Sequence, residues 1–289
     1  MWKSGAFVHH VQHRDPATEL LAFDRVRPQV LQCDSADWQD SFMHTFDDWL
    51  RALEERHLAD LTFPELSRAL RALSSAYVER RGRLKAGAAL SGAGKRAAFA
   101  LFYGPLHYLL VREITLAIGF GPARLTTLLD LGCGTGAAGA AWAQTLPKLP
   151  AVVGLDLNSW VLSEASRTYS AFGLAARTRL GDIAAPGWPT SPAALLAAFT
   201  LNELSDAARE TVLQRLVERG TRGDAVLVVE PVAGFVAPWW NRWREVFEAA
   251  GGRAADWRFP VELPTIVAKL DRAAGLDHRA LTGRSLWFG

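Results

Sequence analysis

The feature that most constrains the fold is a group of three closely spaced glycines near the middle of the chain. Residues 126–143 read TTLLDLGCGTGAAGAAWA, with a short apolar run ending at Asp130 and glycines at Gly132, Gly134 and Gly136. An apolar run, a glycine turn and an alanine-rich segment predict a strand, a tight turn and a helix. Glycines let a ligand approach the backbone, and the helix N-terminus behind them offers free N–H groups. The pattern therefore predicts a nucleotide-binding turn.

The spacing of the glycines narrows the choice of possible ligands. It is Gly-x-Gly-x-Gly, not the Gly-x-Gly-x-x-Gly of dinucleotide sites, and the sequence has no Gly-x-x-x-x-Gly-Lys-Ser/Thr phosphate loop. Both observations weaken a nicotinamide or ATP interpretation. Asp156 ends the next apolar run, where an acid can accept hydrogen bonds from both ribose hydroxyls. The alternative is that Asp156 only caps the following helix.

Composition excludes several classes of protein. The 289 residues are 49% hydrophobic, enough for one large domain or two smaller ones. No apolar run approaches the length that crosses a bilayer, and the N-terminus lacks a secretory pattern. Cys33 and Cys133 are the only cysteines, so neither a disulfide framework nor a four-cysteine metal site can form. We expect a cytoplasmic protein with no metal and no membrane partner.

The net charge of +2 hides a local excess of positive charge. Residues 61–124 carry ten Lys or Arg against three Asp or Glu, whereas residues 1–60 carry six against eleven. The basic side chains of segment 68–112 are Arg68, Arg71, Arg80, Arg81, Arg83, Lys85, Lys95, Arg96 and Arg112. A dense basic face is what contact with RNA phosphates requires. A solvated helical face would give the same pattern.

The periodicity of the chain changes near residue 120. Helical spacing begins at Ser35, and Thr62 and Glu65 form a capping box before a second helix. Beyond residue 121 apolar runs alternate with helical segments, which predicts a doubly wound, mostly parallel α/β sheet. We therefore expect a helical domain over residues 1–120 and an α/β domain over 121–289. The first predicted strand ends at Asp130, and the next four cover residues 151–156, 176–180, 193–199 and 225–230. A hairpin is predicted over residues 277–289, with its turn at Thr282 and Gly283.

The string from Asp130 to Gly136 resembles the first motif of class I S-adenosylmethionine (SAM) methyltransferases. The resemblance implies a Rossmann-like, seven-stranded, mostly parallel sheet with SAM as cofactor. Asp182, after the third predicted strand, resembles the acid that these enzymes place near the adenine amine, although an ordinary loop aspartate is the alternative. The predicted cofactor-binding residues are Asp130, Gly132, Cys133, Gly134, Gly136, Asp156, Leu157, Asp182, Ile183, Phe199, Tyr103 and Arg112.

Candidate catalytic residues follow the fourth predicted strand. Methyl transfer requires alignment of the acceptor with the methyl group and exclusion of water, and it requires no covalent side chain. Asn202 and Glu203 lie where the methyl group should sit, so they are candidates for holding or deprotonating an acceptor. The alternative is that they cap the next helix or bind the N-terminal region. The nearby stripe of Trp239, Trp240 and Trp243 either packs in the core or stacks on a flat acceptor.

A closer resemblance covers residues 62–260. Segments 73–81, 99–112, 201–209 and 229–235 resemble the mitochondrial ribosomal small-subunit assembly methyltransferase-like family, whose bacterial members are described as rRNA methyltransferases. That family usually carries a cysteine cluster after the fifth strand, and residues 232–259 contain no cysteine. The resemblance implies rRNA methylation, with RNA or the ribosomal small subunit bound by the basic segment. Two alternatives stay open: a small-molecule or peptide methyltransferase whose pocket the helical domain roofs, and a non-catalytic SAM-binding ribosome assembly factor.

Overall fold

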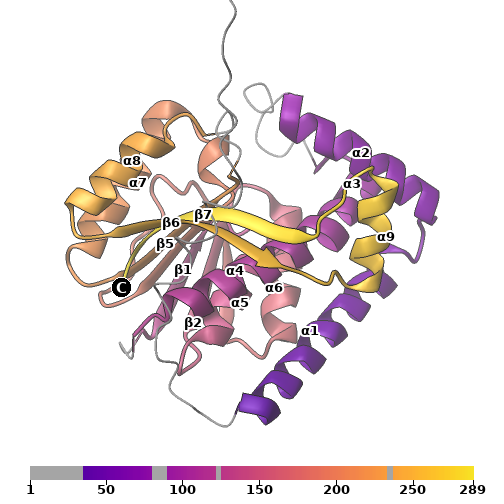
Figure 1. Ribbon diagram of the computed structural model, residues 1–289, viewed down its shortest axis with the longest axis horizontal. Coiled ribbons are helices and arrows are strands. Elements are labelled where there is room, and N and C mark those ends of the chain that lie inside the picture. Colours follow the sequence, from indigo (N-terminus) through magenta and orange to yellow (C-terminus); the bar gives the residue numbers. More distant parts are fainter. Residues whose placement is uncertain (1–34, 80–89, 122–124, 233–236) are drawn as a thin grey trace, which may run out of the picture. The chain divides into compact units, whose positions relative to one another are not determined.

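The computed structural model describes residues 35–79, 90–121, 125–232 and 237–289 (Figure 1). The side chains of residues 35–43 and 76–79 lie outside this description, as do His9, His13, Cys33 and the basic residues between 80 and 89. Residues 36–289 form one compact unit. A separate helical domain ending at residue 120 stays a prediction.

Seven strands form one sheet in the order β3-β2-β1-β4-β5-β7-β6. The first five are parallel, and β7 runs antiparallel to both of its neighbours. This is the doubly wound, seven-stranded Rossmann-like sheet that the sequence predicted. The strands are β1 (Thr127–Leu131), β2 (Ala151–Asp156), β3 (Ala176–Leu180), β4 (Ala194–Ala198), β5 (Ala225–Glu230), β6 (Arg253–Pro260) and β7 (Ala280–Phe288).

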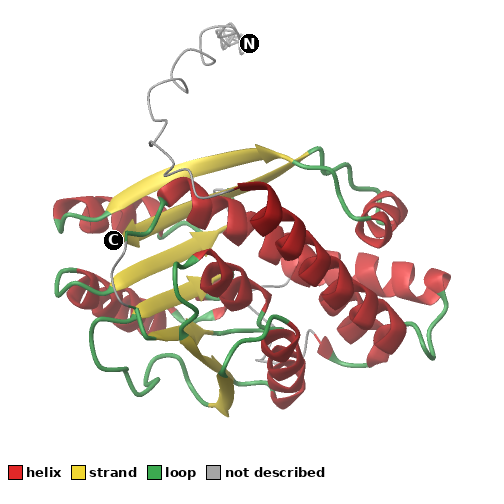
Figure 2. Cartoon of the chain, turned by 90° about the horizontal axis from the view of Figure 1, so that it is seen from below, coloured by secondary structure: helices red, strands yellow, loops and turns green. Residues whose placement is uncertain are grey.

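Helices cover both faces of the sheet, as Figure 2 shows. Successive strand residues face opposite sides, so Leu128 packs in the larger apolar cluster and Leu129 in the smaller one. The helical elements are α1 (Ser35–His57), α2 (Phe63–Glu79), α3 (Ala93–Ala98), the π-helical η4 (Phe99–Tyr103), α4 (Gly104–Ile118), α5 (Ala137–Thr145), α6 (Ser159–Ala171), the 3-10 turn η5 (Leu201–Glu203), α7 (Asp206–Gly220), α8 (Trp240–Ala249) and α9 (Thr265–Ala273). Within the described residues, none of these helices combines the length and apolarity that a bilayer crossing needs.

The N-terminal helices pack directly on the α/β core. The predicted capping box is confirmed, since the Glu65 carboxylate accepts hydrogen bonds from the backbone N–H and the hydroxyl of Thr62 at 2.9 and 2.7 Å. A π-helical turn, a feature common at functional sites, directly precedes Gly104. Trp49 of α1 donates a hydrogen bond from Nε1 to Thr168 of α6 at 3.2 Å. The helices before residue 120 therefore form one wall of the core.

The predicted C-terminal hairpin is wrong. Thr282 and Gly283 lie inside β7, which continues from Ala280 to Phe288 without a turn. A side chain at position 283 would bring its Cβ within 2.9 Å of Leu110 Cδ2, so this glycine allows α4 to pack on the strand. The antiparallel partner of β7 at the sheet edge is β6, which precedes α9.

Glu164 provides a test of how α1 is attached. Its buried carboxylate accepts hydrogen bonds from Arg56 at 2.7 Å and from His57 at 3.1 Å. Burial acts to raise the pKa of Glu164, but the hydrogen bonds from His57 and Arg56 outweigh it and lower the pKa to about 2. A carboxyl with a lowered folded-state pKa stabilises the protein above its unfolded pKa and loses that contribution as the pH falls.

We predict that Glu164→Gln lowers the free energy of unfolding at pH 7 by roughly 2–3 kcal/mol. The difference from the wild type should shrink between about pH 5 and pH 2, measured by urea denaturation. Asp48→Asn is the matched control, because Asp48 pairs with Arg51 at an exposed site. Its effect should stay below about 0.5 kcal/mol.

Candidate active site

A cavity of about 530 Å³ lies at the carboxyl ends of the parallel strands. In open α/β sheets this edge is where ligands bind. Its floor comes from the turns after β1, β2, β4 and β5, and its walls come from α2, η4, α4 and the start of β7. The cavity therefore joins the glycine turn to the N-terminal helices.

Asp156 holds the glycine turn in place. Its carboxylate accepts a hydrogen bond from the Gly134 N–H at 3.1 Å and another from the Asn158 N–H at 2.9 Å. Asn158, not Asp156, caps α6, because its side chain accepts a hydrogen bond from the Trp160 N–H. The interpretation of Asp156 as a simple helix cap is thus wrong. Asp156 links the two turns that form the cavity floor.

The first glycine is required by close packing. Gly132 has a φ of 67°, and a Cβ there would lie 2.0 Å from Thr200 Oγ1. Both Gly132 and Gly134 line the cavity, so their bare backbone is the surface that a ligand meets. This cradle fits the nucleoside cofactor that the sequence predicted.

Asp130 lies beneath the turn as a buried acid. It is 1% exposed and accepts a hydrogen bond from the Tyr169 hydroxyl at 2.8 Å. Burial raises the pKa of the Asp130 carboxyl to about 7. A Cβ at Gly139 would lie 2.2 Å from Asp130 Oδ2, so this glycine leaves room for the carboxylate. A cationic group in the cavity would favour the ionised form of Asp130.

The aromatic half of the cavity is formed by rings of η4 and α4 together with Phe199, and Phe99 of η4 lies next to Gly134. Phe199 follows β4 with a φ of 59°, and it is the one described residue other than glycine with a positive φ. Its ring stacks on His107 of α4, with 3.9 Å between ring centroids and an interplanar angle of 14°. Burial lowers the pKa of His107 to about 3, so this imidazole is neutral at pH 7. Backbone strain of this kind is concentrated at functional sites.

Asn202 is fixed by two partners. Its amide donates a short hydrogen bond to the Glu230 carboxylate, and its carbonyl accepts one from Trp239 Nε1 at 2.9 Å. Glu230 also accepts a hydrogen bond from the Leu201 N–H at 3.1 Å. Asn202 and Glu203 both line the cavity. The arrangement suits Asn202 for positioning an acceptor.

The structure brings most of the predicted site residues to this cavity. Those that line it are Asp130, Gly132, Cys133, Gly134, Asp156, Phe199, Tyr103, Asn202 and Glu203. Gly136, Leu157, Asp182, Ile183 and Arg112 do not line it. Gly136 instead packs under Tyr169, and Leu157 is 55% exposed.

Three of the residues outside the cavity have other partners. The Asp182 carboxylate accepts a hydrogen bond from the Ala184 N–H at 2.9 Å and shapes its own turn. Ile183 is buried in the smaller apolar cluster. Arg112 pairs with the neighbouring Glu113.

Sequence reasoning missed several residues that line the cavity. They include Asn158, Glu230, His278 and Thr282. Glu230 ends a predicted strand, so its position at the same sheet edge could have identified it. No sequence signal identifies His278 as a cavity residue, because its position at the cavity depends on how α9 and β7 pack.

The tryptophan stripe has a mainly structural role. Trp240 and Trp243 are each 4% exposed within the smaller apolar cluster. Trp239 is partly buried and binds Asn202. None of the three lines the cavity. The alternative of a stacking surface for the acceptor is therefore not supported there.

Comparison with known proteins assigns this region to a methyltransferase domain. Residues 128–221, which run from β1 to α7, match a family model described as a methyltransferase domain. No curated protein sequence matches the chain. The matching segment includes the glycine turn, Asp130 and Asp156. SAM is the cofactor of this site, and the glycine cradle with its two carboxylates fits it.

Several solved structures resemble the fold at low sequence identity. The YcgJ protein from Bacillus subtilis is 12% identical over 62% of this chain and 96% of its own, with a TM-score of 0.42. The O-methyltransferase NcsB1 of neocarzinostatin biosynthesis, solved with SAM and 2-hydroxy-5-methyl naphthoic acid, is 17% identical over 82% and 74%, with a TM-score of 0.44. The mitomycin 7-O-methyltransferase MmcR is 14% identical over 83% and 71%, with a TM-score of 0.45.

SAM binding distinguishes the roles of the two predicted cofactor-binding carboxylates, Asp156 and Asp182. We predict that Asp156→Ala weakens SAM binding at least tenfold in calorimetric titration, because the variant loses both the cavity carboxylate and the bond that holds Gly134. Asp182→Ala, with a carboxylate outside the cavity, should bind SAM within twofold of the wild type. Equal losses in both variants would contradict this assignment.

Asp130 should show a trade-off between stability and binding. Its folded-state pKa of about 7 lies above the ordinary 3.8, so its contribution to stability falls as the pH rises between about 4 and 7. We predict that Asp130→Asn, which keeps an acceptor for Tyr169, raises the free energy of unfolding at pH 8 by roughly 2–4 kcal/mol. SAM affinity should fall in the same variant. Urea denaturation at pH 5 and pH 8 measures the first effect, and calorimetry measures the second.

Proposed function

We propose that this chain, a SAM-dependent methyltransferase, methylates a planar ring in RNA, with ribosomal RNA as the first candidate. The observation that carries the proposal is the aromatic half of the cavity, which is continuous with the glycine cradle. A planar ring that enters this half would stack on neighbouring rings. The resemblance of residues 62–260 to the mitochondrial small-subunit assembly methyltransferase-like family supports RNA as the carrier of that ring, and a cytoplasmic location is part of the same proposal.

SAM supplies an electrophilic methyl group on a sulfonium ion. The residues of this chain bind and orient it: Asp156 lies beside the glycine turn and Asp130 beneath it. The neutral His107 and the Phe199 ring form an uncharged wall at the end of β4. Such a wall excludes water from the reacting groups without competing for the methyl group.

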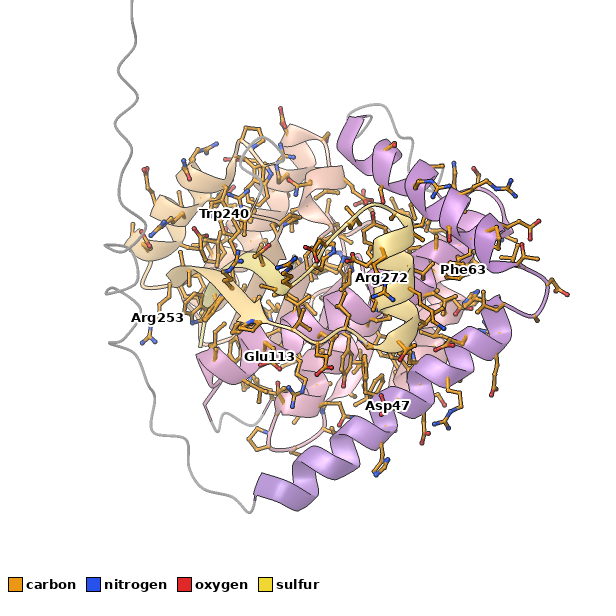
Figure 3. All side chains as sticks on the ribbon, turned by 45° about the vertical axis from the view of Figure 1, so that its right-hand side comes forward. Asp47, Phe63, Glu113, Trp240, Arg253 and Arg272 are labelled. Atoms are coloured by element: carbon orange, nitrogen blue, oxygen red, sulfur yellow. The ribbon has the colours of Figure 1, made fainter. Side chains whose placement is uncertain are left out.

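Basic side chains beside the cavity support RNA as the acceptor. Helix α9 lies against α2, and Arg71 donates a hydrogen bond to the Ala273 carbonyl at 2.8 Å. Figure 3 shows Arg272 on α9 next to α2. Arg68, Lys269 and Arg272 are exposed on these two helices. Ser74 of α2 and His278 after α9 line the cavity, so the helices that carry these charges also border it, and the proposal assigns the charges to phosphate contacts.

Part of the predicted basic segment contributes less than expected. Arg96 donates a hydrogen bond to the Leu90 carbonyl at 3.2 Å and lies over the Trp160 ring. Arg112 is paired with Glu113. Within the described residues, the positive surface available to RNA therefore combines α2 with α9, and the α9 part lies outside the segment that the sequence indicated.

The proposal predicts transfer of labelled methyl groups from SAM to small-subunit rRNA transcripts. Arg68→Glu/Arg272→Glu should raise the KM for RNA at least tenfold at 0.1 M salt while leaving SAM affinity unchanged, because charge reversal repels phosphates. The slope of log affinity against log salt should fall by about 2. Arg244→Glu/Arg253→Glu, with the same charge change on α8 and β6, is the matched control and should bind RNA like the wild type.

A second candidate acceptor is a small planar molecule. The aromatic half of the cavity lies under η4 and α4, which suits a compact ring compound as well as a flipped base. Methylation of small phenols or heterocycles with no RNA affinity would select this candidate. SAM binding without methylation of any RNA or ring compound would contradict both.

A further inference from the structure

We propose that His278, held by the buried Asp271, is the general base that removes the proton from the methyl acceptor. The inference rests on the proposed function, because it concerns the acceptor half of the same cavity. It assigns a catalytic role to His278, which follows α9, and a positioning role to Asp271, which lies within α9.

The geometry of the pair is that of an oriented imidazole. Asp271 is 4% exposed near the end of α9. One of its carboxylate oxygens faces His278 Nδ1 at 2.5 Å, and the other accepts a hydrogen bond from the His278 backbone N–H at 2.9 Å. Because a carboxylate only accepts hydrogen bonds, the contact selects the tautomer with hydrogen on Nδ1. Nε2 is then left with a lone pair.

The His278 side chain lines the cavity, and the proposal directs its Nε2 lone pair toward the acceptor. Its side chain is 36% exposed and lines the cavity together with Leu276 and Thr282. Its ring contacts Phe102, with 6.1 Å between centroids, and Phe102 contacts Tyr103. Further ring contacts run from Tyr103 to His107 and from His107 to Phe199. One aromatic wall therefore connects His278 to the end of β4.

The other titratable groups that line the cavity are less suited to this role. The pKa of about 3 keeps His107 neutral and weakly basic, and burial raises the pKa of the Cys133 thiol. Glu230 already accepts hydrogen bonds from Leu201 and Asn202. Asp130 and Asp156 belong to the glycine turn. The Tyr103 hydroxyl lies 3.0 Å from Ser74 Oγ, and Glu203, which follows β4, is the carboxylate that remains as a competitor.

The charged and polar surroundings of His278 are few. Asp271 faces it from α9. The Tyr103 hydroxyl of η4 lies 3.0 Å from Ser74 Oγ of α2 at the same cavity. On its own segment, Asp277 and Arg279 pair with each other at 2.9 Å. Asp271 is thus the acid placed to stabilise a positive charge on the ring.

The proposed step balances in protons and electrons. A lone pair of the acceptor oxygen or nitrogen forms a bond to the methyl carbon of SAM, and the carbon–sulfur bond breaks with its electrons going to sulfur. The acceptor proton passes to His278 Nε2, and Asp271 stabilises the resulting imidazolium. The imidazolium then releases the proton to water. The products are the methylated acceptor and S-adenosylhomocysteine.

This step narrows the acceptor chemistry. A general base accelerates transfer only to an atom that loses a proton, so the acceptor carries a hydroxyl or an N–H group. In a planar base of RNA this describes a ring N–H group. Among small molecules it describes a phenol or an N–H heterocycle. An unprotonated ring nitrogen would need no such base.

The first test requires no acceptor. Long-range proton–nitrogen NMR spectra of histidine-labelled protein distinguish hydrogen on Nδ1 from hydrogen on Nε2, and loss of one signal in His278→Asn assigns His278 among the seven histidines. We expect the neutral Nδ1–H tautomer in the wild type and its loss in Asp271→Asn. A wild-type His278 with hydrogen on Nε2 would overturn the proposal.

The second test is the pH dependence of methyl transfer. His278→Asn keeps a donor near the Nδ1 position for Asp271 but has no base at Nε2. We expect kcat to fall about 100-fold, with the KM for RNA, SAM affinity and Tm close to wild-type values. The wild-type rate should rise with pH as a single ionisation, and that rise should be absent in His278→Asn. His44→Asn is the control, since His44 is an exposed residue of α1.

Two outcomes separate this inference from the proposed function. If His278→Asn keeps the wild-type kcat and pH profile while Glu203→Gln loses them, the base is Glu203 and the inference fails while the function stands. If the wild type methylates no RNA and no ring compound, the proposed function fails, and with it the catalytic role of His278. The tautomer measurement then shows only whether the pair itself is formed.

Discussion

The two hydrogen bonds that Asp156 accepts are the interaction on which the site depends. They join the turn after β1 to the turn after β2, next to the backbone hydrogen bond from the Cys133 N–H to the Leu155 carbonyl. With this link, Gly132 and Gly134 present bare backbone to the cavity in a single arrangement. A carboxylate that both shapes the floor and faces the ligand gives preorganisation, so less ordering is needed when the cofactor binds.

The same region concentrates features that cost stability. Asp130 is buried close to Asp156, with a pKa raised to about 7, and Phe199 adopts a backbone conformation that residues other than glycine rarely take. Neither feature is needed to close the sheet. Both lie at the carboxyl ends of the strands, next to the cofactor and the acceptor, where a functional site tolerates strain and an uncompensated charge. The rest of the apolar core must offset these costs.

The sequence predicted the local parts of the site better than the distant ones. The glycine turn, Asp156 and Asn202 follow predicted strands, and their placement requires only that parallel strands end at one edge. Asp182 follows a strand as well, but its carboxylate turns to its own backbone, which spacing alone does not reveal. The hairpin prediction failed because Thr282 and Gly283 read as a turn, whereas Gly283 instead makes room for Leu110. Local composition cannot distinguish a turn glycine from one required by packing.

The position of His278 at the cavity could not be predicted from the sequence. This residue lies 122 residues beyond Asp156 in the chain, and it meets the cavity only because β7 inserts antiparallel between β5 and β6. The segment between α9 and β7 contacts η4 through the rings of His278 and Phe102, and it lines the cavity. Early βα turns thus supply the glycine turn and Asp156, and the N-terminal helices and the start of β7 supply other parts of the cavity lining. Because these parts come from separate segments, a substitution in the N-terminal helices or β7 can change the cavity lining without altering the glycine turn, and we therefore infer that these segments determine which acceptor binds.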